Sequence, residues 1–343
     1  MTPVLFASSL SKLRRAKEAC TGHGCQRGTE PPHTERSHFA MHGSSSVLTP
    51  SIRSHFEVLY ATHKLSGASD STFRQYRASL NNFDEFLGRP ATIEDLRDDL
   101  LHQAAHWLAG REKRRSAYTA LKLQENLLAI WRFLLSKHLV IEAPNVKMIP
   151  VPELIPTAWT KPQLRRLWET CQKQTGTYCG VDKAGWWHGL HSVIWDTGER
   201  INAVLQCRWD NLDMRSRYLK IPHSVRKGKR ADMLFRLHRD TILILRAIRD
   251  PERDLIFPWP LHPTSLHNHY RALLSEGNLP TDRYHKFHCL RRSTASYLEA
   301  AGGDATAQLG HEHRSTTKRY LDPRIVKQKH AADLLFRPGK RAS

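Results

Sequence analysis

The sequence is poor in cysteine and contains no long apolar run. Its six cysteines among 343 residues are scattered and form no disulfide framework, which favours a reducing interior. No apolar segment approaches the roughly 20 residues needed to span a bilayer. Residues 4–10 are apolar and precede basic residues, the reverse of the order in a secretory signal peptide. These features exclude a disulfide-stapled secreted domain and a membrane-spanning protein, and we expect a cytoplasmic protein.

Acidic residues are also scarce relative to basic ones. The chain has 33 Asp and Glu against 53 Lys and Arg, which gives a formal net charge of +20. Such an excess predicts a polyanionic partner, because release of counterions from phosphates favours binding. Nucleic acid is the first candidate. A membrane surface is the weaker one, because no basic amphipathic helix is evident.

The ends of the chain have the composition of tails. Residues 1–47 are rich in Ser, Gly, His and Arg and lack apolar periodicity, so we expect a disordered basic tail. Cys20, His23 and Cys25 lie within it, but their spacing fits no zinc pattern. Met41 is an alternative start of the chain. Residues 337–343 are expected to form a short basic tail.

Residues 48–142 predict a small basic helical bundle. Asp70 is the expected N-cap of one helix. Apolar residues recur at helical spacing on three segments and are expected in the core: Tyr76, Leu80, Phe83 and Leu87; Leu96, Leu100, Ala104 and Leu108; Leu123, Leu127, Trp131 and Leu134.

A proline-rich segment follows the bundle and predicts a domain boundary. Residues 143–159 contain Pro144, Pro150, Pro152 and Pro156, which favour an extended linker. Thr160 is the expected N-cap of the next helix, which opens a second, mixed domain over residues 160–336. There, alternation over 217–222 predicts a strand, and residues 233–238 are its expected partner across a basic turn at 227–230. The fold class expected is mainly α with a small β-hairpin.

Four short motifs in the second domain occur in a specific order. Residues 196–209 read Asp-Thr-Gly-Glu-Arg-Ile-Asn-Ala-Val-Leu-Gln-Cys-Arg-Trp, and residues 288–294 read His-Cys-Leu-Arg-Arg-Ser-Thr. Leu-Gly-His ends at His311, and Thr-Thr-Lys-Arg-Tyr ends at Tyr320, nine positions later. These segments resemble the tyrosine recombinase (phage integrase) family motifs TGxRxxEhxxLxW, HxLRHT and LGHxxxxTTxxY. The resemblance extends from about residue 48 to 336.

The resemblance implies a fold and a chemistry. The fold is an N-terminal helical, SAM-like core-binding domain followed by the mixed α/β catalytic domain of the family. Tyr320 is implied as the nucleophile that forms a 3′-phosphotyrosine, with Arg200 and Arg291 on the phosphate. Two guanidiniums suit this task because each presents a planar fork to phosphate oxygens. The remaining implied roles are proton relay for His288 and a hydrogen bond to a phosphate oxygen for His311.

The family also uses a lysine in a hairpin turn to protonate the departing 5′-oxygen. Lys227 is the candidate for this role, and Lys229 is the alternative. We expect no cofactor and no metal, because the sequence has no carboxylate cluster with metal-ligand spacing and no phosphate-cradling glycine loop. His188, His191, His285 and His313 are interpreted as structural.

The sequence departs from the family pattern after the first arginine. The family has Glu or Asp three residues later, whereas this chain has Ala203; Glu199 or a backbone carbonyl is a candidate substitute. After Arg291 the chain has Arg in place of the more common His. Residues expected to contact DNA are Arg74, Arg77, Arg111, Arg114, Lys229, Arg230 and Arg292.

The expected partner is double-stranded DNA with a specific recombination site. The resemblance implies a homotetramer on two DNA sites, a monomer in free solution, a place in the bacterial cytoplasm, and integration or excision of a mobile element. An apolar patch of Ala331, Ala332, Leu334, Leu335 and Phe336 either docks on a neighbouring subunit or packs on its own domain. Two alternatives are a catalytically impaired DNA-binding protein of the same fold and a relaxing enzyme like the type IB topoisomerases.

Overall fold

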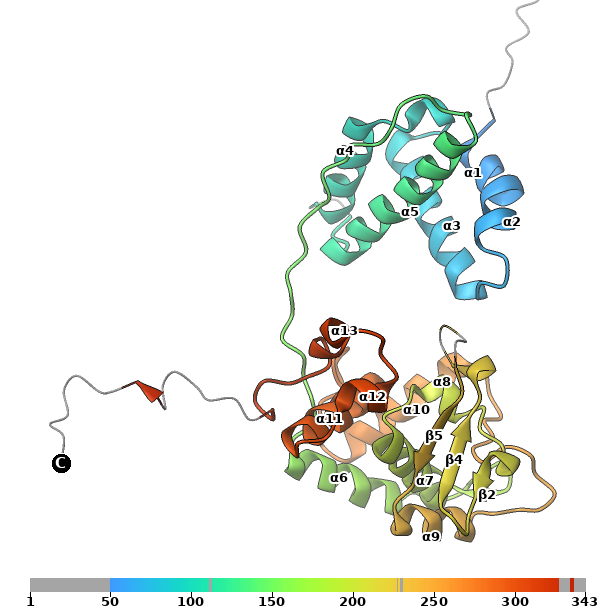
Figure 1. Cartoon of the computed structure of the whole chain (residues 1–343), viewed down its shortest axis with the longest axis vertical. Coiled ribbons are helices and arrows are strands. Elements are labelled where there is room, and N and C mark those ends of the chain that lie inside the picture. Colours follow the sequence, from blue (N-terminus) through green and yellow to red (C-terminus); the bar gives the residue numbers. More distant parts are fainter. Residues whose placement is uncertain (1–49, 111–112, 227, 229–230, 327–333, 336–343) are drawn as a thin grey trace, which may run out of the picture. The chain divides into compact units, whose positions relative to one another are not determined.

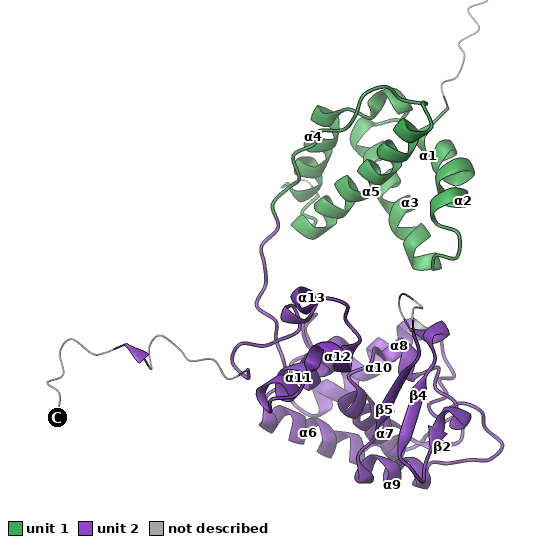
Figure 2. Ribbon diagram, viewed as in Figure 1, with its two compact units in different colours: residues 1–150 green, residues 151–343 purple. Residues whose placement is uncertain are grey.

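The computed structural model describes residues 50–110, 113–226, 228, 231–326 and 334–335. The chain divides into two compact units, residues 1–150 and residues 151–343 (Figure 2). The predicted tails at 1–47 and 337–343 lie outside the described residues, as do Arg111, Lys227, Lys229 and Arg230.

The regular elements in the described part of the first unit are all helical (Figure 1). Its first helix runs from Ile52 to Lys64 and is α-helical at both ends, with a π-helical turn at Phe56–Tyr60. The elements of this unit are α1 (Ile52–His55), α2 (Ala61–Lys64), α3 (Asp70–Leu87), a 3-10 turn at Ile93–Asp95, α4 (Asp98–Ala109) and α5 (Ala117–Ser136).

The predicted apolar stripes form the core of this unit. In α3, Leu80 and Phe83 are buried, and in α5 all four stripe residues are buried. The prediction of Asp70 as an N-cap is wrong by one position: Ser69 is the extended capping residue, and Asp70 is the first helical residue. A carboxylate in the first turn is still favourable there, because it faces the positive end of the helix dipole.

The proline-rich segment is extended but held at both ends. Between Ser136 and Lys161 the structure contains no helix or strand. At one end, the buried amide of Gln124 in α5 accepts from the N–H of Ile149 at 2.8 Å and donates to the carbonyl of Lys147 at 3.2 Å. At the other end, Trp159 is fully buried in the second unit.

The second unit is mainly helical with two small antiparallel sheets. Its core surrounds α7, and residues on nearly all sides of this helix are buried. His191 in α7 is fully buried and contacts the carbonyl of Trp187 at 2.7 Å, which confirms a structural place for this histidine. The helices are α6 (Lys161–Gln172), α7 (Lys183–Thr197), α8 (Ile201–Val204), α9 (Arg239–Ala247), α10 (Pro263–Glu276), α11 (Phe287–Ala300), α12 (Ala305–Leu309) and α13 (Arg314–Lys318).

Thr160 caps α6 as predicted. Its side chain and that of Gln163 form a reciprocal capping box, which satisfies two backbone donors of the first turn. The predicted hairpin is also confirmed: β4 (Tyr218–Ile221) pairs with β5 (Met233–Arg236), with Leu219 opposite Phe235. The sequence did not predict β3 (Leu212–Asp213), which completes this sheet, or the separate pair β1 (Thr177–Tyr178) and β2 (Val181–Asp182). One 3-10 turn, Trp209–Asn211, precedes β3, and another, His223–Val225, lies between β4 and β5.

The apolar patch expected near the C-terminus is only partly described. Leu334 and Leu335 are exposed, and Ala331, Ala332 and Phe336 lie outside the described residues. No helix in the part of the chain that the structure describes is long and apolar enough to cross a membrane.

Candidate active site

The first site segment is the turn that ends α7. Gly198 takes a left-handed conformation with φ of 67°, and a Cβ there would lie 2.9 Å from Leu309 in α12. Thr197 fixes the turn by donating to the carbonyl of Val193 and accepting from the N–H of Glu199. The chain then enters α8 with Arg200 as its extended capping residue, so this turn sets where the Arg200 side chain begins.

Arg291 lies at the centre of the site. It projects from α11 and is completely buried. Its Nη1 donates to the carbonyl of Gly198, and its Nη2 lies 3.2 Å from both the carbonyl of Leu309 and Nε2 of His311. Burial and the positive charge of Arg200 lower the pKa of Arg291 below its usual range. Arg291 therefore joins the turn after α7 to the turn after α12.

His311 follows the left-handed cap Gly310 of α12. A guanidinium has no acceptor, so the contact with Arg291 requires that Nε2 of His311 accept and that its proton reside on Nδ1. That nitrogen lies 3.0 Å from the hydroxyl of buried Thr317. Burial and the charges of Arg291 and Arg200 lower the pKa of His311 to about 4. His311 is thus a neutral imidazole at pH 7.

Tyr320 packs onto this cluster. The guanidinium carbon of Arg291 lies 5.3 Å from its ring centroid. The rings of His288 and His311 lie 5.2 and 4.9 Å away, centroid to centroid. The N–H of Tyr320 donates to the carbonyl of Thr317 at 2.8 Å, which fixes the tyrosine one short turn after α13.

The structure therefore gathers most of the predicted catalytic residues. Arg291, His311 and Tyr320 are in mutual contact, and the ring of His288 packs on Tyr320. Arg200 is close enough for its charge to lower the pKa of Arg291 and of His311. Lys227 and its alternative Lys229 lie outside the described residues.

The predicted DNA-contacting residues differ in their surroundings. Arg74 and Arg114 are exposed. Arg77 is exposed but forms a two-point ion pair with Glu57, with both N–O distances at 2.8 Å. Arg292 turns its Nη2 to the backbone carbonyl of Tyr284. Arg111 and Arg230 lie outside the described residues.

Sequence reasoning missed one site residue, Arg226. Its Nε donates to Oε1 of Glu199 at 2.6 Å, and its side chain is only 10% exposed. The guanidinium lies against Gly310, where an added Cβ would be 2.6 Å from Nη2 of Arg226. Arg226 directly precedes the basic turn at 227–230, and its local sequence does not distinguish it from that turn. A Glu beside Arg200 was the available signal, because a buried carboxylate requires a cation.

Glu199 is the buried carboxylate of the site. Its side chain is 1% exposed, its Oε2 accepts from the N–H of Arg200 at 3.0 Å, and the same oxygen lies 3.7 Å from Nη1 of Arg291. Ala203 is buried as well and carries no charge. The guanidiniums of Arg226 and Arg291 thus share one carboxylate, which also accepts from the backbone N–H of Arg200. The resulting excess of positive charge in a water-poor site favours an anionic ligand that gains charge during a reaction.

The fold and the site together define the catalytic domain of a tyrosine recombinase. Residues 159–325 match the model of the phage integrase family. These residues of the second unit therefore form a domain of this family. No curated protein sequence matches the chain.

Several solved structures share the fold. A lambda integrase dimer bound to a COC′ core site is 15% identical, with a TM-score of 0.61 over 81% of this chain and 97% of that one. The Tn1549 transposon integrase in complex with transposon right end DNA is 12% identical, with a TM-score of 0.66 over 83% and 97%. The XerH site-specific recombinase bound to a palindromic difH substrate is 18% identical, with a TM-score of 0.57 over 74% and 77%.

Proposed function

We propose that the protein is a site-specific DNA recombinase that cleaves and rejoins DNA through Tyr320. The phenolic oxygen attacks a backbone phosphorus, a bond forms to the 3′-phosphate, and the bond to the 5′-oxygen breaks. The 5′-hydroxyl of another strand then attacks the phosphotyrosine and releases Tyr320. The observation that carries the proposal is the packing of Tyr320 over Arg291, next to the rings of His288 and His311.

Each side chain of the site has a role in this scheme. Arg200 and Arg291 neutralise the charge that develops on the phosphorane. The pKa of a free tyrosine is about 10, so the phenol needs a base, and the exposed ring of His288 lies next to it. His311 donates to a phosphate oxygen after it takes up a proton, because phosphate charge raises the pKa of a neighbouring imidazole. Lys227, or Lys229 in its place, protonates the 5′-oxygen.

The partner in this proposal is double-stranded DNA with a specific site. The first unit carries the exposed basic residues of a core-binding domain, and the second carries the reacting groups. Four copies act on two sites, and the free protein is a monomer. Lambda integrase, which shares the fold, is known as a tetramer bound to a Holliday junction. The biological task is integration or excision of a mobile element in a bacterial cytoplasm.

A second candidate is a DNA-binding protein that has kept the fold and lost cleavage. Ala203 favours it, because the carboxylate expected at this position is missing. Glu199 argues for activity, because it supplies a buried negative charge within 3.7 Å of Arg291. A third candidate is a relaxing enzyme like the type IB topoisomerases. It would differ from a site-specific recombinase because it would relax supercoiled DNA without preferring a particular site.

The test uses nicked duplexes tiled across the DNA that flanks the gene. The nick lets the short strand with the 5′-hydroxyl diffuse away, so a protein–DNA adduct that resists boiling accumulates. We expect the adduct with the unaltered protein on one tiled segment and no adduct with Tyr320→Phe, which binds the same segment equally well. Binding without an adduct, unrestored by Ala203→Glu, would favour the second candidate. Relaxation of any supercoiled plasmid would favour the third.

A further inference from the structure

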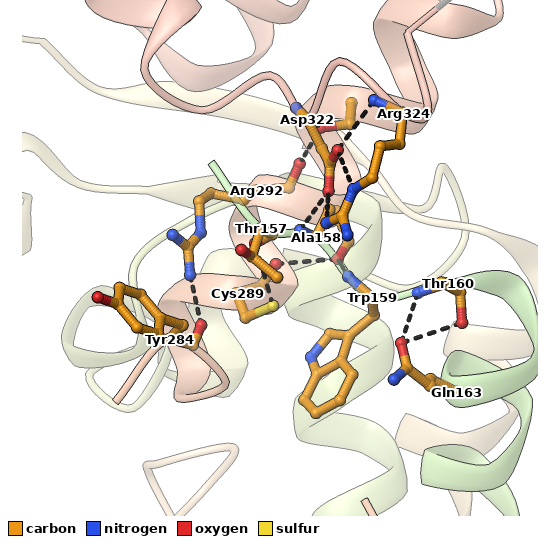
Figure 3. Close-up of polar contacts among 12 residues, drawn as sticks. Thr157, Ala158, Trp159, Thr160, Gln163, Tyr284, Cys289, Arg292, Asp322 and Arg324 are labelled. Carbon is orange, nitrogen blue, oxygen red and sulfur yellow. Dashed lines mark hydrogen bonds and ion pairs between the residues drawn. The ribbon is translucent and has the colours of Figure 1, made fainter. Parts of the chain in front are cut away.

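Asp322, two residues after Tyr320, is a charged group buried outside the reacting cluster. Its side chain is 1% exposed. Oδ2 accepts from the N–H of Ala158 at 2.9 Å, and Oδ1 accepts from the N–H and Nε of Arg324 at 3.0 and 2.9 Å (Figure 3). Arg324 is 65% exposed, so the ion pair is at the surface. The contact with Ala158 is the buried one, and it joins segments 164 positions apart in the chain.

The backbone around Tyr320 is held against α11 by the hydroxyl of Ser296. The N–H of Asp322 donates to the hydroxyl of Ser296 in α11 at 2.9 Å. That hydroxyl lies 3.3 Å from the carbonyl of Tyr320 and 2.8 Å from the carbonyl of Arg292. Residues 320–322 therefore lie along the helix that carries His288 and Arg291. Asp322 fixes the downstream end of this short segment.

The end of the linker is attached to the same helix at two points, Thr157 and Trp159. The thiol of Cys289 donates to the carbonyl of Thr157 at 3.3 Å. The N–H of Trp159 donates to the hydroxyl of Ser293 at 2.7 Å. Between these two contacts, the N–H of Ala158 faces Asp322 (Figure 3). Residues 157–159 thus pack on α11, and Asp322 links them to the segment that carries Tyr320.

We propose that Asp322 is a positioning residue for Tyr320, which it holds in place by binding the end of the linker between the two units. The inference rests on the proposed role of Tyr320 as nucleophile. A buried carboxylate is unfavourable unless its hydrogen bonds offset the loss of water, so its presence here has a structural purpose. A nucleophile needs sub-ångström placement, and a shift of about 1 Å can slow a reaction by roughly 100-fold. The linker at Ala158 is connected to Tyr320 by the hydrogen bond to Asp322 and by the two-residue backbone step from Asp322 to Tyr320, so a shift of Ala158 would displace Tyr320.

The test compares three variants on the nicked duplex that forms an adduct with the unaltered protein. Asp322→Ala removes the contact with Ala158. Arg324→Gln removes the exposed ion pair and leaves that contact in place. Ser293→Ala removes the neighbouring buried hydrogen bond of the linker without touching the segment of Tyr320. For each, the dissociation constant, the adduct rate at saturating DNA and the unfolding midpoint in urea are measured.

We expect Asp322→Ala to lower the saturating adduct rate about 10- to 100-fold with the dissociation constant within twofold. Arg324→Gln and Ser293→Ala stay within threefold of the unaltered rate. An Asp322→Ala rate within threefold overturns the proposal, and so does an equal loss in Ser293→Ala, since general loosening would then suffice. If Asp322→Ala does not fold, Asp322→Val, which also lacks an acceptor for the N–H of Ala158, replaces it, and a rate equal to that of Arg324→Gln overturns the proposal. Failure of the unaltered protein to form any adduct would instead count against the proposed function.

Discussion

At the scale of single residues, the site carries its negative charge at a different position from that in the family motif. The family places a carboxylate three residues after the first arginine, where this chain has Ala203 at 2% exposure. Glu199 instead lies one residue before that arginine and contacts Arg226 and Arg291. Because clustered guanidiniums repel one another in a buried site, one carboxylate among them stabilises the whole arrangement. Arg226 then fixes Glu199 in turn.

Replacement of Glu199 tests this substitution. Glu199→Gln keeps the shape and removes the charge, so Arg226 and Arg291 stay buried without a counter-charge. We expect the free energy of unfolding to fall by about 3 kcal/mol, the usual result of breaking a buried ion pair. We also expect the adduct rate on a nicked site to fall about 100-fold, as for loss of one preorganised electrostatic partner.

The matched control for this variant is Glu57→Gln, which removes the partner of the exposed Arg77. Exposed ion pairs contribute little, so stability should change by less than about 1 kcal/mol. An unchanged adduct rate in Glu199→Gln would show that the site needs no carboxylate at this position.

At the scale of elements, the site depends on how α7 meets α12. Gly198 ends α7, its carbonyl accepts from Arg291, and its open side faces Leu309 and Thr294. A side chain at this position would therefore be strained twice, by the left-handed backbone and by contact with α12.

Substitution of two glycines can distinguish the strain of the left-handed backbone from the steric contact with α12. Gly198→Ala and Gly88→Ala both place a Cβ at a positive φ, 67° and 69°, but nothing lies within 4 Å of the position in Gly88. We expect Gly88→Ala to destabilise the first unit by about 1 kcal/mol and to leave the adduct rate unchanged. Gly198→Ala should destabilise the second unit by roughly 1–3 kcal/mol more and slow adduct formation. Hydrogen exchange of α3 and α7 measures each unit, and equal adduct rates would contradict the role of Gly198.

What the sequence predicted, and what it did not, follows from the range of the interactions. The helices α3 and α5 were predicted because one face of each carries a long apolar stripe, and the hairpin because Leu219 and Ile221 alternate with polar residues. Strands β1, β2 and β3 have two residues each, too few to show a period. Local patterns set these outcomes.

The site was predicted through motifs and not through contacts. Arg291, His311 and Tyr320 were predicted because the spacing of their motifs along the chain resembles that of the family. Arg226 was missed because its role is to pair with Glu199, which lies 27 positions away in the chain. Its neighbours in sequence do not distinguish it from the basic turn that follows. The neutral state of His311 also depends on three-dimensional neighbours, since Arg291 and Arg200 lower its pKa.

At the scale of the whole molecule, the net charge of +20 does not act uniformly on DNA. Basic residues that are paired within the protein release fewer counterions on binding than those with no acidic neighbour. In α3, Arg74 and Arg77 lie three positions apart and are both exposed. Arg77 is paired with Glu57, whereas Arg74 forms no ion pair with any residue in the described ranges.

These two arginines therefore predict different salt dependences of binding. The logarithm of the binding constant falls linearly with the logarithm of salt concentration, with a slope of about −0.9 per phosphate contacted. Arg74→Ala should make this slope shallower by about 1, and Arg77→Ala should change it by much less because Glu57 already neutralises that side chain. Titrations of one duplex from about 50 to 200 mM salt measure both slopes. If Arg77→Ala has the larger effect, the ion pair with Glu57 opens on DNA and α3 contacts the backbone through Arg77.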